Sequence, residues 1–180
     1  HLYKGRINYY VNSHEQNCGH AATGYAKSSG KTGVSIVTSG PGVTNSITPL
    51  LDATNDSTPF ILISGQVPLS AKGTNAFQEA PAVELTQHVT KWSYQVRNIE
   101  EIPYIMDKAF FIANDKKCGS VHIDVPKCIS SSNIFEPSIE FTNKDSETSH
   151  IDENLINQAT KKINESNRPI IIVGQGAKKS

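Results

Sequence analysis

The sequence predicts an α/β fold, a doubly wound and mostly parallel sheet. Two observations lead to this prediction. Short runs rich in β-branched residues alternate with longer segments of helical periodicity, which is the pattern of βαβ units. Residues 34–38 (VSIVT) and 60–64 (FILIS) are almost continuously apolar, as expected of strands buried on both faces of a parallel sheet. The 180 residues leave room for one domain and the start of another.

The first half of the chain alternates strand and helix. Residues 7–11 (INYYV) are expected to form a strand. Ser13 and Gln16 have the spacing of a capping box, so a helix should run from there to about residue 28. The strand over 34–38 then leads through a glycine-rich turn into a helix over 43–54.

The second half continues the alternation. The strand over 60–64 is followed by a long irregular stretch that reaches about Pro81. After it we expect a strand over 92–96, a helix over 100–114 and a strand over 121–125 (VHIDV).

A polar segment divides the chain. Residues 130–150 lack periodicity and contain Pro137, so we interpret them as a linker between a first domain over 1–129 and the start of a second over 151–180. In the latter, a helix over 151–163 should lead into a buried strand over 169–173 (PIIIV). The sequence begins and ends in the middle of this pattern, so we expect a fragment truncated at both ends.

Composition excludes several classes of function. The 17 Lys and Arg residues balance 17 Asp and Glu residues, which leaves no basic face for nucleic acid. No apolar run reaches the roughly 18–20 residues of a membrane span. Cys18, Cys118 and Cys128 lack the spacing of metal ligands and are odd in number, so we expect neither a zinc site nor a disulfide framework. A reducing compartment fits, and secretion does not.

Candidate ligand-binding residues follow the predicted strands, because ligands of open parallel sheets bind at the carboxyl ends of the strands. Glu15 lies there in the first turn of a helix, where a carboxylate either serves a ligand or caps the helix. The glycine-rich turn 39–42, with Asn45, could receive a phosphate or a ring. Phe77, in the irregular stretch, either folds back onto the core or has a function.

Several motifs resemble those of one enzyme family. HEQNCGH (14–20) resembles the glutamate-bearing motif of thiamine-diphosphate enzymes, and TSGPGVTN (38–45) resembles their second signature. Four further motifs narrow the resemblance to the catalytic, or large, subunit of acetolactate synthase: GQVP (65–68), GTNAFQE (73–79), TKW (90–92) and DVPK (124–127). The resemblance covers about residues 1–130 and extends loosely to 180, where the central domain would begin.

The resemblance implies thiamine diphosphate as cofactor, and a reaction that decarboxylates pyruvate and joins the remaining unit to a second 2-ketoacid in branched-chain amino-acid biosynthesis. It makes Glu15 the catalytic carboxylate that hydrogen-bonds the pyrimidine ring nitrogen of the cofactor. Pro41 and Asn45 match further cofactor-binding positions. We expect burial against an aromatic ring to raise the pKa of Glu15.

Substrate-binding residues are also implied. Phe77 and Gln78 match positions that line the substrate pocket, and Pro68, Ala76 and Lys127 match positions at the substrate channel. In the family an Arg associated with FAD precedes the last strand, and here Lys117 replaces it, without the planar fork that Arg offers.

The resemblance further implies Mg²⁺ bound through a C-terminal domain, FAD bound through the central domain, and an active site between the subunits of a homodimer or tetramer, with or without a regulatory small subunit. The 180 residues alone should then be inactive. The compartment would be the cytoplasm, a plastid or a mitochondrion. Two alternatives stay open: another thiamine-diphosphate 2-ketoacid decarboxylase, oxidase or carboligase, and a non-catalytic homologue.

Overall fold

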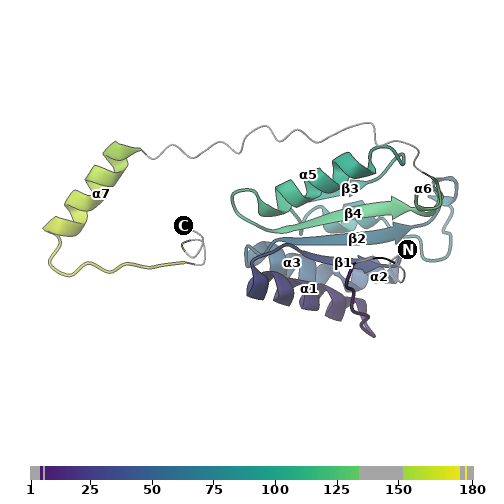
Figure 1. The fold of residues 1–180 in the computed structure, drawn as a ribbon, viewed down its shortest axis with the longest axis horizontal. Helices are drawn as coiled ribbons and strands as arrows, with labels where there is room; N and C mark the ends of the chain where they lie inside the picture. Colours follow the sequence, from purple (N-terminus) through teal and green to yellow (C-terminus); the bar gives the residue numbers. More distant parts are fainter. Residues whose placement is uncertain (1–4, 6, 134–151, 175–176, 178–180) are drawn as a thin grey trace. The chain divides into compact units, whose positions relative to one another are not determined.

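The computed structural model describes residues 5, 7–133, 152–174 and 177 (Figure 1). The chain divides into two units, His1–Phe141 and Thr142–Ser180. Among the described residues, no helix is both long and apolar enough to cross a membrane.

The first unit is built on a four-stranded, wholly parallel sheet. Its strands are β1 (Gly33–Val37), β2 (Phe60–Gln66), β3 (Trp92–Gln95) and β4 (Ser120–Pro126), in the order β1-β2-β4-β3. The register aligns the strand starts, with Gly33 opposite Phe60 and Phe60 opposite Ser120. These strands and the helices between them confirm the predicted α/β class.

Helices cover both faces of the sheet (Figure 1). On one face, α1 (Glu15–Ser29) and α3 (Ile47–Asn55) pack on Phe60 and Leu62 of β2. On the other, α5 (Ile102–Asn114) packs on Ile61, Val121 and Ile123. Shorter helices complete the unit: α2 (Pro41–Asn45), the 3₁₀ helix η2 (Leu69–Ala71), α4 (Ala82–Thr86) and α6 (Lys127–Ser130).

Close backbone packing explains the small residues of α1. A Cβ on Gly19 would lie 2.4 Å from Pro49 Cγ in α3, and a Cβ on Gly33 would lie 2.1 Å from the carbonyl oxygen of Ala22. These glycines let α1 approach both α3 and the start of β1. Gly24, on the exposed side of α1, has nothing within 4 Å of its Cβ position.

Two predicted strands are absent from the described residues. Residues 7–11 are not part of the sheet, and Tyr10 and Val11 are each 87% exposed. Residues 169–173 are likewise not a strand, and Ile172 is 92% exposed. Both runs have high β-propensity, but a strand also needs a neighbour that accepts and donates its ladder hydrogen bonds. No described residue pairs with either run.

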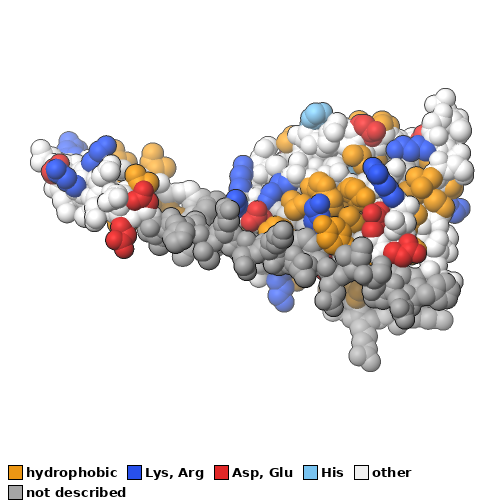
Figure 2. All heavy atoms as spheres, turned by 90° about the horizontal axis from the view of Figure 1, so that it is seen from above, with side chains coloured by type: hydrophobic (Ala, Val, Ile, Leu, Met, Phe, Trp, Pro, Cys, Tyr) orange, Lys and Arg blue, Asp and Glu red, His pale blue; other side chains and the backbone are white. Residues whose placement is uncertain are grey.

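The strand predicted over 34–38 forms as β1 but is buried on one face only. Val34 is 42% and Ile36 is 56% exposed. The reason is position, because β1 is an edge strand and the buried core under α5 is formed by β2 and β4. Figure 2 shows that hydrophobic side chains gather on one face of the first unit, with charged side chains around them.

Helix boundaries differ from the prediction at two places. His14, not Ser13, caps α1, since its Nδ1 accepts a hydrogen bond from the backbone N–H of Gln16 at 3.1 Å. The helix predicted over 43–54 is broken at Ser46 into α2 and α3. Pro49 has no N–H with which to continue a single helix through this point.

The remaining helix predictions are close to the structure. The predicted helix over 100–114 forms as α5, whereas α4 and α6 were not expected, because helices of four or five residues leave no periodicity to detect. In the second unit, α7 (Glu153–Glu165) confirms the helix expected over 151–163. The Asp152 carboxylate caps α7 by accepting from the N–H of Asn154 at 2.9 Å. Most of the predicted linker lies outside the described residues.

Candidate functional site

The candidate residues follow from the direction of the chain. Because α1 leads directly into β1 and packs along it, its first residue, Glu15, lies at the carboxyl end of the sheet. Helix α2 starts at Pro41, just after β1 ends, and therefore lies at the same end. In Figure 1 the arrowheads of the strands, α2, α6 and the start of α1 all lie at the right-hand end of the first unit.

A hydrogen bond joins two of the predicted residues. Asn45 Nδ2 donates to Glu15 Oε2 at 3.0 Å, across 30 positions of sequence. Both side chains are half-buried. The topology therefore brings together the glutamate of the first motif and the last residue of the second.

The Glu15 carboxylate is stabilised in its charged form. Its pKa is lowered from the ordinary value, mainly by the Asn45 amide and then by its own backbone N–H, with His14 adding a smaller favourable charge. Desolvation acts in the opposite direction and is the weaker effect. The expectation that burial raises this pKa is wrong for this structure, because Glu15 is only half-buried and has gained a hydrogen-bond donor in Asn45.

The glycine-rich turn packs against the loop that carries Phe77 and Gln78. Gly40 has φ 57° and ψ −110°, and a Cβ there would lie 2.7 Å from the carbonyl oxygen of Gln78. Only glycine combines this backbone conformation with so close an approach. The second signature (38–45) and the motif over residues 73–79 are therefore neighbours.

The loop of residues 73–79 is held from within by Glu79. Its carboxylate accepts hydrogen bonds from the backbone N–H groups of Gly73 and, at 3.2 Å, of Ala76. These bonds lower the pKa of Glu79. Asn75 and Gln78 have φ values of 58° and 62°, a left-handed conformation that costs residues other than glycine about 1–3 kcal/mol each.

This loop presents Phe77 to solvent. The side chain of Phe77 is 90% exposed, so it does not fold back onto the core. Beside it lies a shallow cavity of about 390 Å³ that includes Ala76 and Glu79 in its lining. The loop thus displays an aromatic side chain next to a hollow at the carboxyl end of the sheet.

The other predicted residues divide between the two ends of the sheet. Pro68 immediately precedes η2 after β2, and Lys127 begins α6 after β4, so both lie at the end that carries Glu15. Lys117 comes before β4 and is exposed, which places it at the opposite end. The structure does not bring Lys117 to the other candidates.

A buried polar network was missed by the sequence interpretation. His122 is fully buried in β4, with its Nε2 2.8 Å from Ser64 Oγ and its Nδ1 2.8 Å from Thr86 Oγ1. Ser64 donates to Asp124 Oδ1 at 2.8 Å, and Gln95 Nε2 donates to Asp124 Oδ2 at 2.6 Å. Burial lowers the pKa of His122 to about 4 and raises the pKa of Asp124.

The signal for this network was present in VHIDV. His122 and Asp124 are two residues apart, and side chains at that spacing on a strand lie on the same face of the sheet. Two polar side chains on one face of a buried strand predict a hydrogen-bonded cluster, because buried polar groups must be satisfied.

Comparison with known proteins gives a family match for the first part of the chain. Residues 1–85 match the family described as thiamine pyrophosphate enzyme, N-terminal TPP binding domain. The match covers the first part of the first unit, and the parallel sheet of this unit is consistent with the fold of that domain.

Over nearly its whole length the chain is similar to acetolactate synthases. It is 41% identical over 180 residues to the mitochondrial acetolactate synthase catalytic subunit of Saccharomyces cerevisiae, covering 95% of this chain and 26% of that protein. It is 41% identical over 179 residues to the large subunit from Lactococcus lactis, covering 98% of this chain and 31% of that protein. The chloroplastic enzyme of Arabidopsis thaliana is 43% identical over 172 residues, covering 91% of this chain and 25% of that protein. The chain thus spans about a quarter to a third of the length of these relatives.

The site's chemistry fits the pyrimidine half of the cofactor. Glu15 offers an ionised and accessible carboxylate, which is a suitable partner for a ring nitrogen. Among the described residues there is no group of three or more His, Cys, Asp or Glu side chains that could hold a metal ion.

Proposed function

We propose that this chain is the pyrimidine-binding part of a thiamine diphosphate-dependent acetolactate synthase. The complete catalytic subunit would decarboxylate pyruvate and join the remaining two-carbon unit to a second 2-ketoacid. The observation that carries the proposal is the Glu15 carboxylate, held by Asn45 at the carboxyl end of the parallel sheet. The similarity to acetolactate synthases over nearly the whole chain supports it.

Glu15 would act on the cofactor through the pyrimidine ring. Bound thiamine diphosphate supplies an electron sink for the loss of CO₂ from a 2-ketoacid. Glu15 would share a proton with the ring nitrogen, and Pro41 would lie beside the ring. The lowered pKa of Glu15 favours the proton on the ring nitrogen and the charge on the carboxylate.

The loop of residues 73–79 would provide the substrate side. Phe77 and Gln78 would contact the second 2-ketoacid. The Glu79 carboxylate, which accepts hydrogen bonds from the backbone N–H groups of Gly73 and Ala76, would hold the loop that carries them in place. Pro68, Ala76 and Lys127 would border the path of the substrate, and Lys127 would attract the carboxylates of both ketoacids. Support comes from their position at the end of the sheet that carries Glu15.

Other parts of the complete subunit would supply the binding sites for Mg²⁺ and FAD. We assign Mg²⁺ to the part that binds the diphosphate, and FAD to the central domain that begins near residue 151. Lys117 replaces an Arg that the family associates with FAD, and without the planar fork of Arg it would hold FAD less firmly. Two catalytic subunits would form the site between them, with or without a regulatory subunit. The compartment would be the cytoplasm, a mitochondrion or a plastid.

The test is acetolactate formation from pyruvate by the complete catalytic subunit. Glu15→Gln keeps the size of the side chain but cannot share a proton with the ring nitrogen, so activity should fall at least on the order of a hundredfold. Glu100→Gln, at an exposed position, serves as the control and should retain activity. Pyruvate consumption without acetolactate would instead assign another 2-ketoacid decarboxylating reaction, and no turnover in the wild type would favour a non-catalytic homologue.

A further inference from the structure

We infer that Asn45 is a positioning residue, which fixes the orientation of the Glu15 carboxylate and stabilises its charged form rather than binding the cofactor itself. The inference rests on the proposed function of Glu15. It differs from the role that the sequence suggested for Asn45, because the amide nitrogen of this side chain is already committed to Glu15.

The Asn45 side chain is held by a buried turn. Asn45 is the last residue of α2, and the following Ser46 is fully buried and donates its hydroxyl to the carbonyl of Gly42 at 2.7 Å. Val43, also fully buried, anchors the middle of the helix. The donor therefore sits on a fixed backbone, so it can set the direction of a carboxylate at the start of another helix.

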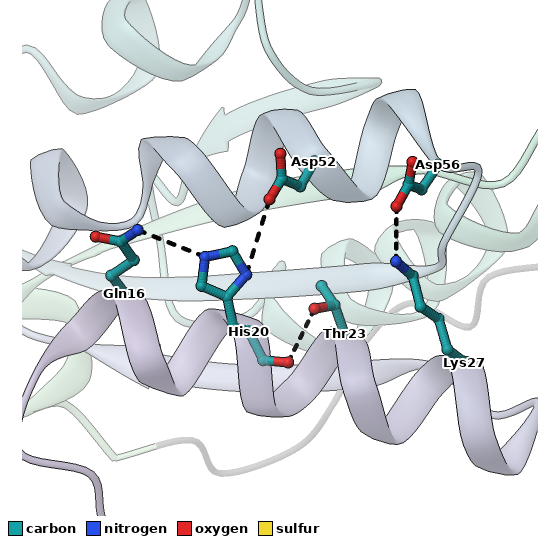
Figure 3. Close-up of polar contacts among 6 residues, drawn as sticks. All are labelled: Gln16, His20, Thr23, Lys27, Asp52 and Asp56. Atoms are coloured by element: carbon teal, nitrogen blue, oxygen red, sulfur yellow. Dashed lines mark hydrogen bonds and ion pairs between the residues drawn. The ribbon is translucent and has the colours of Figure 1, made fainter.

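Among the described residues, no ionisable side chain on α2, β1 or β2 competes with this hydrogen bond, since none of these three elements contains one. Helix α4, which also packs against α2, carries Glu84, and this side chain is exposed. Asp52 of α3 lies 3.9 Å from His20, and Asp56, the C-cap of α3, accepts a hydrogen bond from Lys27 at 2.6 Å (Figure 3). His20 and Lys27 lie farther along α1 than Glu15. His14, the residue before Glu15, adds a smaller charge effect that lowers the pKa of Glu15 in the same direction as Asn45.

The consequence concerns the shared proton. Asn45 donates to Oε2, and a donor to a carboxylate stabilises the ionised form over the protonated one. With Asn45 in place, the proton shared between Glu15 and the ring nitrogen is displaced toward the ring nitrogen. Without Asn45 the proton would remain on Glu15 more of the time, and the activation that Glu15 provides would weaken.

The first test is independent of enzyme activity. In the 180-residue chain, the titration of the Glu15 side-chain carboxyl is followed by carbon-13 NMR in the wild type and in three variants. Asn45→Ala should raise the pKa of Glu15, and Asn45→Asp, which keeps the shape but replaces the donor by a second acid, should raise it further. Thr44→Ala is the matched control in α2, because its hydroxyl bonds only to the carbonyl of Pro41, and should leave the titration unchanged.

An unchanged pKa in Asn45→Asp, with the backbone amide spectrum intact, would overturn the inference. The same holds for equal shifts in Asn45→Ala and Thr44→Ala, which would show a general effect of disturbing α2. If Asn45→Ala does not fold, the isosteric Asn45→Asp decides the question alone.

The second test separates positioning from substrate binding in the complete catalytic subunit. Asn45→Ala should lower kcat on the order of tenfold, the value of one hydrogen bond to a charged group, while KM for pyruvate changes little. A raised KM with unchanged kcat would show that Asn45 contacts the substrate, contrary to the inference. Absence of acetolactate formation in the wild type would refute the proposed function and leave the titration to decide the role of Asn45.

Discussion

The buried His122 should make the stability of the first unit depend steeply on pH in mild acid. His122 is fully buried between Ser64 and Thr86, and burial lowers its pKa from 6.5 to about 4. The unfolded chain therefore takes up this proton at a higher pH than the folded chain. The contribution that neutral His122 makes to the free energy of unfolding is fully present above pH 6.5. It is lost as the pH falls from 6.5 to about 4.

The size of the effect follows from the two pKa values. Their difference corresponds to about 3 kcal/mol of folding free energy in total, of which about 2 kcal/mol is lost between pH 7 and pH 5. His122→Leu replaces the titrating imidazole with an apolar side chain of similar size. At pH 7 the variant should lose about 1 kcal/mol, because Ser64 keeps its bond to Asp124 and Thr86 keeps its bond to the carbonyl of Ala82.

Urea unfolding at pH 7 and pH 5, followed by the fluorescence of Trp92, measures this difference. Trp92 is the single tryptophan and lies on β3, next to β4. The wild type should lose about 2 kcal/mol more than His122→Leu between the two pH values. His88→Gln, at an exposed position, should behave like the wild type. Equal pH dependence in the wild type and His122→Leu would show that His122 does not cause the loss of stability in acid.

Two further predictions concern the loop at the carboxyl end of the sheet. Gly40→Ala should destabilise the first unit by about 2 kcal/mol or more, since it places a Cβ against Gln78 at a positive φ. Gly24→Ala in α1, where the Cβ position is open, should stabilise the unit by roughly 0.5–1 kcal/mol. Thermal unfolding compares the two variants, and equal effects would contradict the packing described. Glu79→Gln weakens the acceptor that holds the loop, so hydrogen exchange at the Gly73 amide should accelerate at neutral pH, and an unchanged exchange rate would show that Glu79 does not hold it.

The fold class was predictable because β2 and β4 carry their signal locally. FILIS and VHIDV are buried on the sheet and lie where the sequence placed them. INYYV and PIIIV have equal β-propensity but no described neighbour to pair with, and pairing is a property of the whole fold. The exposure of Ile36 has the same origin, because no local pattern reveals that β1 is an edge strand.

The site was predictable in position but not in electrostatics. The rule that ligands bind at the carboxyl ends of parallel strands brought Glu15 and Asn45 to one place from 30 residues apart. The direction of the pKa shift depends on one amide hydrogen bond and on solvent exposure, which only coordinates reveal. The prediction failed there because it assumed burial without a donor.

Under the proposed function, Glu15 activates the thiamine cofactor. The most direct measurement is the rate at which the C2 proton of bound thiamine diphosphate exchanges with deuterium in the complete catalytic subunit, compared between the wild type and Glu15→Gln. We expect exchange to slow by orders of magnitude in Glu15→Gln while the cofactor remains bound. Exchange at the wild-type rate in Glu15→Gln would contradict it.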